Sequence, residues 1–358
     1  MNHNFLVHKK DFFDCDVRSS EIPRTKENEV VFKIESYAFT SNNITYAVVG
    51  DSMGYWNFFP THEPNGIIPV WGFANVVESG HTEIKVGERF YGYWPMAHYL
   101  KVQPAHIKSH GLVDGSSHRS KLPPLYNYYA RVKGTSSKEE NGYYSLIKPL
   151  FTTAYLNYRF LQEERFFNAS QIVLTSASSK TALGIAYMLF ANREDHGKKI
   201  IGLTSESNQD FVESTGFYDQ VIPYGDVSDK LTDRSTMVID LSGNTELLQN
   251  LTYQLKEQLK FVSLIGLADW TSAGPTKQIP KARFFFAPEY AQKLFADLGP
   301  EKANKMINEA QEKFTKHVSG WMELEFVDFE KGVKKLYIDM LNGKVHPSKG
   351  YIVTIKNE

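Results

Sequence analysis

The segment Gln171-Ile-Val-Leu-Thr-Ser-Ala-Ser-Ser-Lys180-Thr-Ala-Leu-Gly-Ile-Ala186 decides the fold of this chain. Its first residues predict a buried strand ending at Leu174, the small residues that follow predict a turn, and an apolar helix is expected from near Ser179. In dinucleotide-binding folds, a strand, turn and helix in this order hold a pyrophosphate against the N–H groups at the start of the helix. The segment therefore predicts a phosphate-binding turn.

Serines occupy the turn where a glycine-rich fingerprint has glycines. Ser176, Ser179 and Ala182 stand at the glycine positions, and each Cβ narrows the space for a phosphate. Serine hydroxyls can donate hydrogen bonds in compensation, and Lys180 adds a cation where phosphate charge would gather. Taken alone, the segment also fits a parallel-sheet crossover that binds no ligand. The candidate phosphate-binding residues are Ser176, Ala177, Ser178, Ser179, Lys180 and Thr181.

Further strand–helix units follow this segment, and a helix over 143–167 precedes it. Strands are expected at 198–205, 220–226, 235–243 and 261–269, with helices at 208–215 and within 246–260. Strands that alternate with helices at this spacing favour a parallel sheet. This part of the chain is predicted to be a doubly wound α/β domain.

The first ~110 residues have a different pattern, with strands and turns but no helices between them. Strands are expected at 29–39, 44–51, 66–80 and 85–102, which suggests a small barrel or sandwich. Residues 106–142 are polar and predict a loop. From Pro288 a polar, helix-like stretch runs to His317, and the segments 322–327, 331–341 and 351–356 predict a strand, a helix and a strand.

Composition limits the function classes. The 358 residues suggest two domains, and a formal net charge of −1 argues against general nucleic-acid binding. The only cysteine, Cys15, excludes a disulfide framework and zinc sites built on several cysteines. The N-terminal sequence has no signal-peptide pattern, and the longest apolar stretch, 182–191, is about half the ~20 residues of a membrane span. We expect a soluble, cytoplasmic protein with no membrane partner.

An ordered series of segments resembles the medium-chain dehydrogenase/reductase superfamily, in particular its zinc-free, quinone-oxidoreductase-like branch and reductase-like proteins of unassigned function. EVVFKIESYAFTSNN (29–43) is similar to the first strands of that superfamily and the segment after them. The other similar segments are ANVVESG (74–80), KVGERFYG (85–92), LIKPLFTTAYLNY (146–158), TMVIDLSG (236–243) and NGKVHPSKGYIVTI (342–355). No one of them is specific, but their order along the chain is fairly specific.

The resemblance implies a GroES-like catalytic domain, residues 1–139 with 288–358, and a Rossmann domain, residues 140–287. Resembling proteins often dimerise through the edge of the Rossmann sheet, which makes a homodimer one candidate, although the sequence leaves the oligomeric state open. The zinc branch requires cysteine and histidine ligands, but Phe73 stands where a Gly-His-Glu motif would carry its glutamate. With a single cysteine the zinc sites of the family are absent, so no metal site and no zinc-dependent alcohol dehydrogenation are expected.

The expected cofactor is NADPH, in preference to NADH. The segment LTSES (203–207) has no carboxylate at the strand tip to bind the ribose 2′-hydroxyl of NAD, whereas Thr204 and Ser205 can donate to a 2′-phosphate. These two residues also fit simple capping of the next turn. The resemblance assigns Tyr224 to the adenosine end and Thr153 to the nicotinamide, and adds Leu241 and Gly266 to the cofactor-binding residues.

Without a metal, neutral hydrogen-bond donors have to polarise the substrate carbonyl and supply a proton. The segment similar to the family's substrate loop offers Asn43, Thr45 and Tyr55 as catalytic candidates, although a buried core position explains Tyr55 as well. Aromatic residues make up 14% of the chain, and many cluster around 55–59 and 91–94. This suggests an apolar or aromatic small-molecule substrate, and core packing explains the cluster equally well.

Three other motifs in the sequence are typical of different functions. Gly50-Asp-Ser52-Met-Gly54 fits the elbow of serine hydrolases, with Asp240 and His317 in a suitable chain order, but no helix is expected directly after Ser52. Ser179-Lys180-Thr181 resembles the end of a Walker A loop without its glycines. His106 and His110 would share one face if their segment were a helix, but solvated loop histidines are the simpler interpretation.

The sequence thus predicts a zinc-independent, NADPH-dependent oxidoreductase that reduces a conjugated carbonyl or quinone-like small molecule. The alternative is a protein that binds the dinucleotide without turnover, which the serine-rich turn favours. A serine hydrolase using Ser52 is a third, weaker hypothesis.

Overall fold

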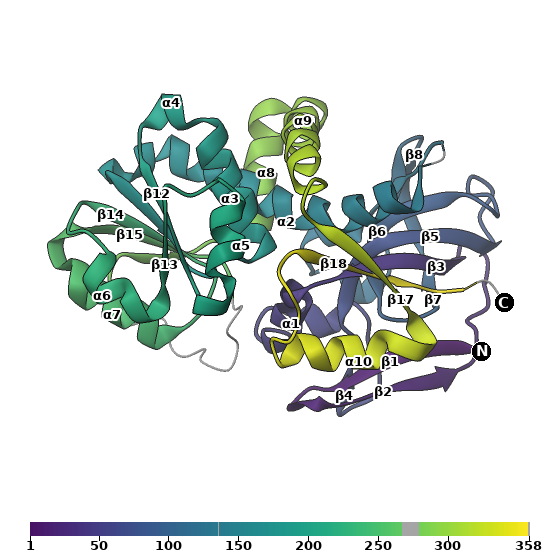
Figure 1. The fold of residues 1–358 in the computed structure, drawn as a ribbon. Coiled ribbons are helices and arrows are strands. Elements are labelled where there is room, and N and C mark those ends of the chain that lie inside the picture. The colour runs from purple at the N-terminus through teal and green to yellow at the C-terminus, as the bar shows by residue number, and fades with distance from the viewer. Residues whose placement is uncertain (135, 267–278, 357–358) are drawn as a thin grey trace. The chain divides into compact units, whose positions relative to one another are not determined.

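The computed structural model describes residues 1–134, 136–266 and 279–356, which form two compact units (Figure 1). Unit 1 comprises the described residues of Met1–Leu146 and Met322–Glu358, and unit 2 is Ile147–Trp321. The first boundary falls inside the long helix α2 (Lys138–Glu163). Among the described helices, none combines the length and the apolar character needed to cross a bilayer.

Unit 2 is built on a parallel sheet, as predicted. In the described chain its strands follow the order β13-β12-β11-β14-β15-β16, and every neighbouring pair is parallel. The strands are β11 (Gln171–Leu174), β12 (Lys199–Thr204), β13 (Gln220–Pro223), β14 (Thr236–Asp240), β15 (Leu259–Leu264) and β16 (Ala282–Phe284). The fold class, a Rossmann-type α/β unit beside a separate β-rich unit, is confirmed.

The helices of unit 2 alternate with these strands. They are α3 (Lys180–Ala191), α4 (Arg193–His196), α5 (Gln209–Ser214), α6 (Val227–Lys230), α7 (Thr245–Leu255), α8 (Ala287–Leu298) and α9 (Pro300–Val318), besides the second part of α2. Val173, Ile201 and Val238 from three neighbouring strands share one buried cluster with Leu248 and Leu251 of α7. This shared burial follows from the apolar strand runs, which are buried along their whole length, and from the amphipathic pattern of α7.

Helices α8 and α9 belong to unit 2, whereas the predicted boundary at residue 288 places them with the N-terminal domain. Phe314 of α9 stacks on Phe151 of α2, with ring centroids 5.0 Å apart, and lies 5.2 Å from the ring of Tyr187 in α3. Phe314 and Ile307 are buried on one face of a helix whose overall composition is polar. The overall composition of α9 is polar and gives no sign of this apolar face. Only the helical spacing of its apolar residues shows where the helix packs.

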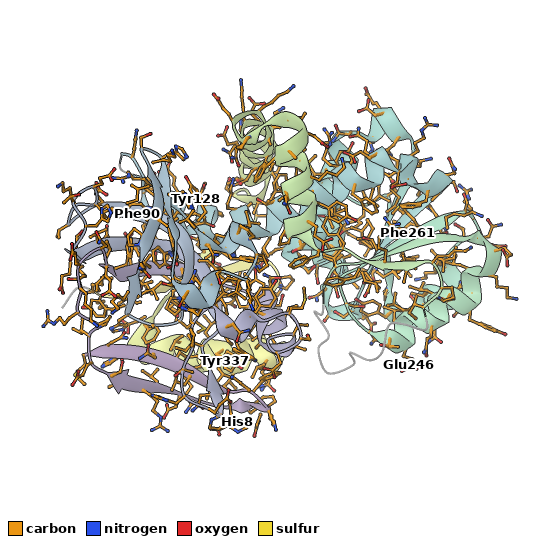
Figure 2. The ribbon with its side chains drawn as sticks, turned by 180° about the vertical axis from the view of Figure 1, so that it is seen from behind. His8, Phe90, Tyr128, Glu246, Phe261 and Tyr337 are labelled. Atoms are coloured by element: carbon orange, nitrogen blue, oxygen red, sulfur yellow. The ribbon has the colours of Figure 1, made fainter. Side chains whose placement is uncertain are left out.

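Unit 1 is mostly antiparallel sheet. In the described chain the large sheet has the order β17-β18-β3-β5-β6-β10-β9-β8, with β7 also paired to β3, and a small sheet has the order β2-β1-β4. The strands are β1 (Asn2–His8), β2 (Asp11–Ser20), β3 (Val30–Phe39), β4 (Asn65–Gly66), β5 (Pro69–Ser79), β6 (Arg89–Pro95), β7 (Tyr99–Val102), β8 (Pro104–Lys108), β9 (Gly111–Asp114), β10 (Tyr128–Arg131), β17 (Glu323–Asp328) and β18 (Lys349–Thr354). Helix α10 (Phe329–Leu341) packs against β2 and β17, and Figure 2 labels its residue Tyr337 and, in another part of this unit, Phe90 of β6, both of which are fully buried.

Two predictions for unit 1 are wrong. Residues 44–51, expected as a strand, lie mostly in helix α1 (Ser41–Val48), which begins after the extended residue Thr40. The Asn43 side chain accepts a hydrogen bond from the Thr40 N–H (2.8 Å), so a local side-chain bond starts the helix despite its β-branched residues. Residues 106–142, expected as a loop, contain β9 and β10, where Leu112 and Tyr129 are fully buried. These strands are four residues long, too short to show a periodic pattern.

Candidate functional site

A cavity lies in unit 2 beside the turn that follows β11. Its volume is about 420 Å³, within the usual range for small-molecule sites. The carboxyl ends of parallel strands meet at one edge of a sheet, where α/β folds bind their ligands. The cavity is lined by Ser176, Ser178, Thr204, Ser205, Asn208, Tyr224, Ser242, Asn244, Glu246, Leu247 and Asn250. Ser176, Ser178, Thr204, Ser205 and Tyr224 of the predicted site are thus brought together.

The serine-rich turn leaves this cavity open. Ser176 has a left-handed backbone (φ 46°), and its N–H donates to the Tyr224 hydroxyl, 2.9 Å away. Ala177 turns inward, where its N–H donates to the Leu203 carbonyl at 2.9 Å and its carbonyl accepts from the Tyr218 hydroxyl at 3.0 Å. A Cβ on Gly202 would lie 2.9 Å from the Ala177 Cβ, so the turn can approach β12 only because residue 202 is glycine.

Helix α3 starts directly after the turn. Ser179 is its N-cap, and the Ser179 side chain accepts a hydrogen bond from the Ala182 N–H at 3.3 Å. Lys180 and Thr181 are half-buried in the first turn, where the N–H groups have no acceptor within the helix and the helix dipole favours an anion. Burial lowers the pKa of Lys180 to about 8. This start of α3 has the chemistry of a phosphate site.

Asp240, at the end of β14, fixes the sheet edge under the cavity. Its buried carboxylate accepts hydrogen bonds from the Thr175 hydroxyl (2.5 Å), the Ser242 hydroxyl (2.6 Å) and the Gly243 N–H (3.0 Å). Burial raises the pKa of Asp240, and these hydrogen bonds oppose that shift. Thr175 Oγ1 in turn accepts from the N–H of Leu241 at 3.0 Å. The network joins the turn after β11 to the turn after β14.

Sequence reasoning missed part of the lining, namely the residues after β14 and Asn208. Asn244 is the N-cap of α7 and accepts from the Leu247 N–H at 2.9 Å, which places Glu246 and Asn250 beside the cavity. The Asn208 amide donates to the Ser178 hydroxyl at 3.3 Å. An Asn that follows a predicted strand and precedes a predicted helix was the signal that could have found Asn244.

Seven predicted cofactor residues do not line this cavity: Ala177, Ser179, Lys180 and Thr181, which belong to the neighbouring turn and helix start, and Thr153, Leu241 and Gly266. Thr153 lies in α2 with its hydroxyl bonded to the Pro149 carbonyl at 3.2 Å. Leu241 is buried, and a Cβ on Gly266 would lie 3.0 Å from the Leu241 carbonyl oxygen. Leu241 and Gly266 therefore shape the strand ends rather than the cavity wall.

The catalytic candidates Asn43, Thr45 and Tyr55 belong to unit 1. Asn43 is buried, and its amide also donates to the Pro69 carbonyl at 2.9 Å, so both ends of its side chain have backbone partners. The Tyr55 hydroxyl is buried 3.1 Å from the Tyr126 hydroxyl, in a cluster that includes Tyr46 and Phe58. Burial raises the pKa of Tyr55, which keeps its hydroxyl protonated. Thr45 is half-buried, and its hydroxyl lies 3.5 Å from the Ser41 carbonyl.

A family model described as a protein of unknown function, DUF2855, matches residues 37–346. This chain belongs to the DUF2855 family. No curated protein matches it.

Solved structures share the fold of this DUF2855 protein across nearly the whole chain. CurA from Vibrio vulnificus in complex with NADPH is 15% identical with a TM-score of 0.61, covering 99% of this chain and 100% of that one. CurK enoyl reductase is 12% identical (TM-score 0.57, 99% of each chain). A structure described as a putative NADPH:quinone reductase from Bacillus thuringiensis is also 12% identical (TM-score 0.56, 99% and 98%). This chain therefore shares the fold of these structures.

The other motifs of this DUF2855 chain have structural explanations. Ser52 is exposed in a turn after helix α1, with its hydroxyl bonded to the Val49 carbonyl at 3.3 Å, so no strand leads into it as the hydrolase elbow requires. His106 lies in strand β8 rather than on a helix, and His110 in the turn after it. Asp240 is committed to the buried network described above.

Proposed function

We propose that this protein is an NADPH-dependent oxidoreductase that reduces a conjugated carbonyl or quinone-like small molecule. The observation that carries the proposal is the open, hydroxyl-lined cavity of unit 2, bordered by the serine turn that leads into α3. The cavity fits the adenosine end and pyrophosphate of a dinucleotide, whose anionic groups suit serine hydroxyls and a helix N-terminus. The shared fold with the NADPH complex of CurA supports this assignment.

In the proposed complex, the groups that line the cavity and those at the start of α3 next to it have separate tasks. Ser178 and the start of α3 bind the pyrophosphate, with Lys180 contributing positive charge. Thr204 and Ser205 donate to the 2′-phosphate, and Tyr224 borders the adenosine end while its hydroxyl fixes the backbone of Ser176. Thr153, Leu241 and Gly266 remain proposed cofactor residues through the family resemblance.

In unit 1, the proposed chemistry needs a polariser for the carbonyl oxygen and a proton donor. When bound, the nicotinamide supplies a hydride to the electron-poor carbon of the substrate. Thr45 and Tyr55 act as neutral hydrogen-bond donors, since Tyr55 stays protonated in its buried cluster. Asn43 is a positioning residue, because its side chain holds the start of α1 against β5.

The proposal also covers metal use, assembly and location. Reduction proceeds without zinc, the protein forms a homodimer, and it works in the cytoplasm without membrane or nucleic-acid partners. The zinc part is supported by the single cysteine and by Phe73. Sedimentation of the purified chain tests the dimer.

Nucleotide titration tests the proposal. Fluorescence of NADPH and of NADH is followed on mixing with the protein, and NADPH oxidation is then measured with a panel of enones and quinones. Ser205→Ala should weaken NADPH binding about ten- to hundredfold, the effect of one hydrogen bond to a charged group. The matched control is Ser214→Ala, because Ser214 is an exposed serine of the same unit bonded to the Phe211 carbonyl. If neither nucleotide binds, the proposal fails.

A second candidate is dinucleotide binding without turnover. It is favoured by the internal partners of two catalytic candidates, Asn43 with Thr40 and Pro69, and Tyr55 with Tyr126. Saturable NADPH binding with no oxidation by any enone or quinone would support this candidate over the enzyme.

A further inference from the structure

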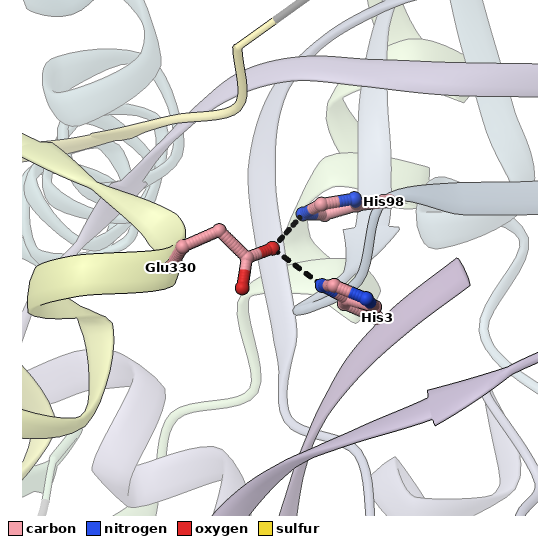
Figure 3. A group of neighbouring side chains, drawn as sticks. All are labelled: His3, His98 and Glu330. Carbon is pink, nitrogen blue, oxygen red and sulfur yellow. Dashed lines mark hydrogen bonds and ion pairs between the residues drawn. The ribbon is translucent and has the colours of Figure 1, made fainter. Parts of the chain in front are cut away.

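Three potential metal-binding side chains converge in unit 1, namely His3, His98 and Glu330 (Figure 3). Glu330 Oε1 lies 2.6 Å from His3 Nδ1 and 2.9 Å from His98 Nε2. The three ligand atoms all lie within 4.8 Å of one another. The residues come from β1, from the connection between β6 and β7, and from the first turn of α10.

The two histidines are held together by the backbone. His98 N–H donates to the His3 carbonyl at 2.9 Å, and the neighbouring Phe5 N–H donates to the Met96 carbonyl at 2.8 Å. These bonds place the imidazole rings with centroids 5.0 Å apart. Folding of the backbone alone therefore brings both rings to one place.

Glu330 lies on helix α10, whose position is fixed by contacts other than those of Glu330 itself. Asp328 caps α10 by accepting from the Lys331 N–H at 3.1 Å. The buried ring of Phe329, next to Glu330, lies 4.9 Å from the His98 ring, and Tyr337 on the same helix lies 5.1 Å from Phe5 of β1. These contacts fix the first turn of α10, and with it the backbone of Glu330, next to the two histidines.

Two imidazoles and one carboxylate form a ligand set that suits zinc and related transition metals, and that leaves a position for water. Zn–N and Zn–O bonds of about 2.1 Å place tetrahedral ligand atoms about 3.3 Å apart, so rearrangement by about 1 Å would seat the ion. Glu330 can make this adjustment because its side chain is 45% exposed, whereas those of His3 and His98 are 26% and 14% exposed. Solvent thus reaches the site from the side of the carboxylate.

We propose that His3, His98 and Glu330 form a binding site for one divalent transition-metal ion, with Zn²⁺ as the best match. The expectation of no metal site rests on cysteine-containing ligand sets, and this set uses no cysteine. The ion would link β1, the β6–β7 connection and α10, whose ligands are up to 327 positions apart in sequence. It would therefore stabilise unit 1 rather than take part in the proposed reduction.

Calorimetric titration of the full chain with ZnCl₂, after removal of metals with a chelator, tests the site. The expected result is one Zn²⁺ per chain and a higher unfolding temperature, since a ligand that binds only the folded state stabilises it. His3→Gln, His98→Gln and Glu330→Gln should each weaken the binding at least about tenfold, because each removes a ligand. His62→Gln, a change to an exposed histidine of the same unit, should leave it unaltered.

X-ray absorption of the zinc-loaded wild-type protein makes the test independent of how the variants fold. Nitrogen and oxygen scattering that includes two imidazoles is expected, and a sulfur ligand, which only Cys15 or a methionine could supply, would overturn the site. The site is also overturned if the wild-type chain shows no saturable binding, or if the three variants bind Zn²⁺ as tightly as the wild type does.

Discussion

The Thr175 hydroxyl donates a 2.5 Å hydrogen bond to Asp240 Oδ1 and so ties the turn after β11 to the end of β14. Thr175 Oγ1 in turn accepts from the N–H groups of Leu241 (3.0 Å) and Ser242 (3.1 Å). All of these groups are buried. Because this bond is made at the two turns that border the cavity, it links the stability of unit 2 to the shape of its candidate site.

Thr175→Val should therefore lower the free energy of unfolding by about 2 kcal/mol, since it removes one hydrogen bond from the buried Asp240 carboxylate and leaves the buried Leu241 N–H without a partner. Thr175→Ser keeps the hydroxyl and should cost much less. Urea unfolding measures both. Equal losses for the two variants would show that the methyl group, not the hydrogen bond, carries the effect.

Ser176→Gly should stabilise the protein by up to about 1 kcal/mol, because Ser176 has a left-handed backbone that glycine adopts without strain. Ser178 lies in the same turn without a positive φ, so Ser178→Gly should destabilise. Thermal unfolding of the two variants compares them directly. The prediction is refuted if Ser176→Gly loses as much stability as Ser178→Gly.

NADPH affinity should fall as the pH rises through about 8. Burial lowers the pKa of Lys180 to about 8, so its positive charge is present below that pH and disappears above it, while the phosphates stay ionised. Lys180→Ala should weaken binding by about 1–2 kcal/mol at pH 7 and remove the pH step. Fluorescence titrations at several pH values measure both effects, and an unchanged affinity in this variant would exclude Lys180 from the site.

Glu246→Gln should favour NADPH over NADH. Glu246 places a carboxylate on the wall of the cavity, and the described lining contains no lysine or arginine. At an effective dielectric constant between those of water and protein, repulsion between this carboxylate and a 2′-phosphate weakens NADPH binding by on the order of 1 kcal/mol. The ratio of the two dissociation constants should rise about fivefold in favour of NADPH. A ratio equal to that of the wild type would place the 2′-phosphate away from Glu246.

Thr45→Val should lower kcat about 100-fold without changing NADPH affinity, the usual cost of losing a donor to a developing oxyanion. Thr45→Ser, which keeps the hydroxyl, is the matched control. Asn43→Ala should instead reduce stability, because Asn43 bonds to the backbone of Thr40 and Pro69. Steady-state kinetics with the best substrate found measure kcat for these variants. Full activity in Thr45→Val would exclude the Thr45 hydroxyl as a catalytic hydrogen-bond donor.

The parallel sheet could be predicted from sequence because its strands are short apolar runs at regular spacing. Gln171–Leu174 and Thr236–Asp240 are examples in which composition and periodicity agree. Helix α1 could not be predicted in this way, since the bond between Asn43 and Thr40 outweighs the β-branched and aromatic residues that follow. Local capping of this kind leaves no periodic trace.

The candidate site was partly predictable for a related reason. Ser176 follows a predicted strand, Thr204 and Tyr224 lie near the ends of two others, and parallel strands bring such residues to one edge. Glu246 and Asn250 reach the cavity only through the direction in which α7 leaves the sheet, which no sequence pattern gives. His3, His98 and Glu330 meet by tertiary pairing, since the two histidines sit on hydrogen-bonded neighbouring backbones and the carboxylate arrives on α10.

Unit 1 is interrupted in sequence by the whole of unit 2, and this has a consequence for its synthesis. Residues 36–39 of β3 pair with residues 351–354 of β18, so this part of the β3 edge has no partner until the ribosome has also made residues 147–321. Unit 2 is continuous and has all its strands available earlier. The nascent chain therefore carries an unpaired strand edge for much of its translation, at the stage when such edges are most prone to aggregate.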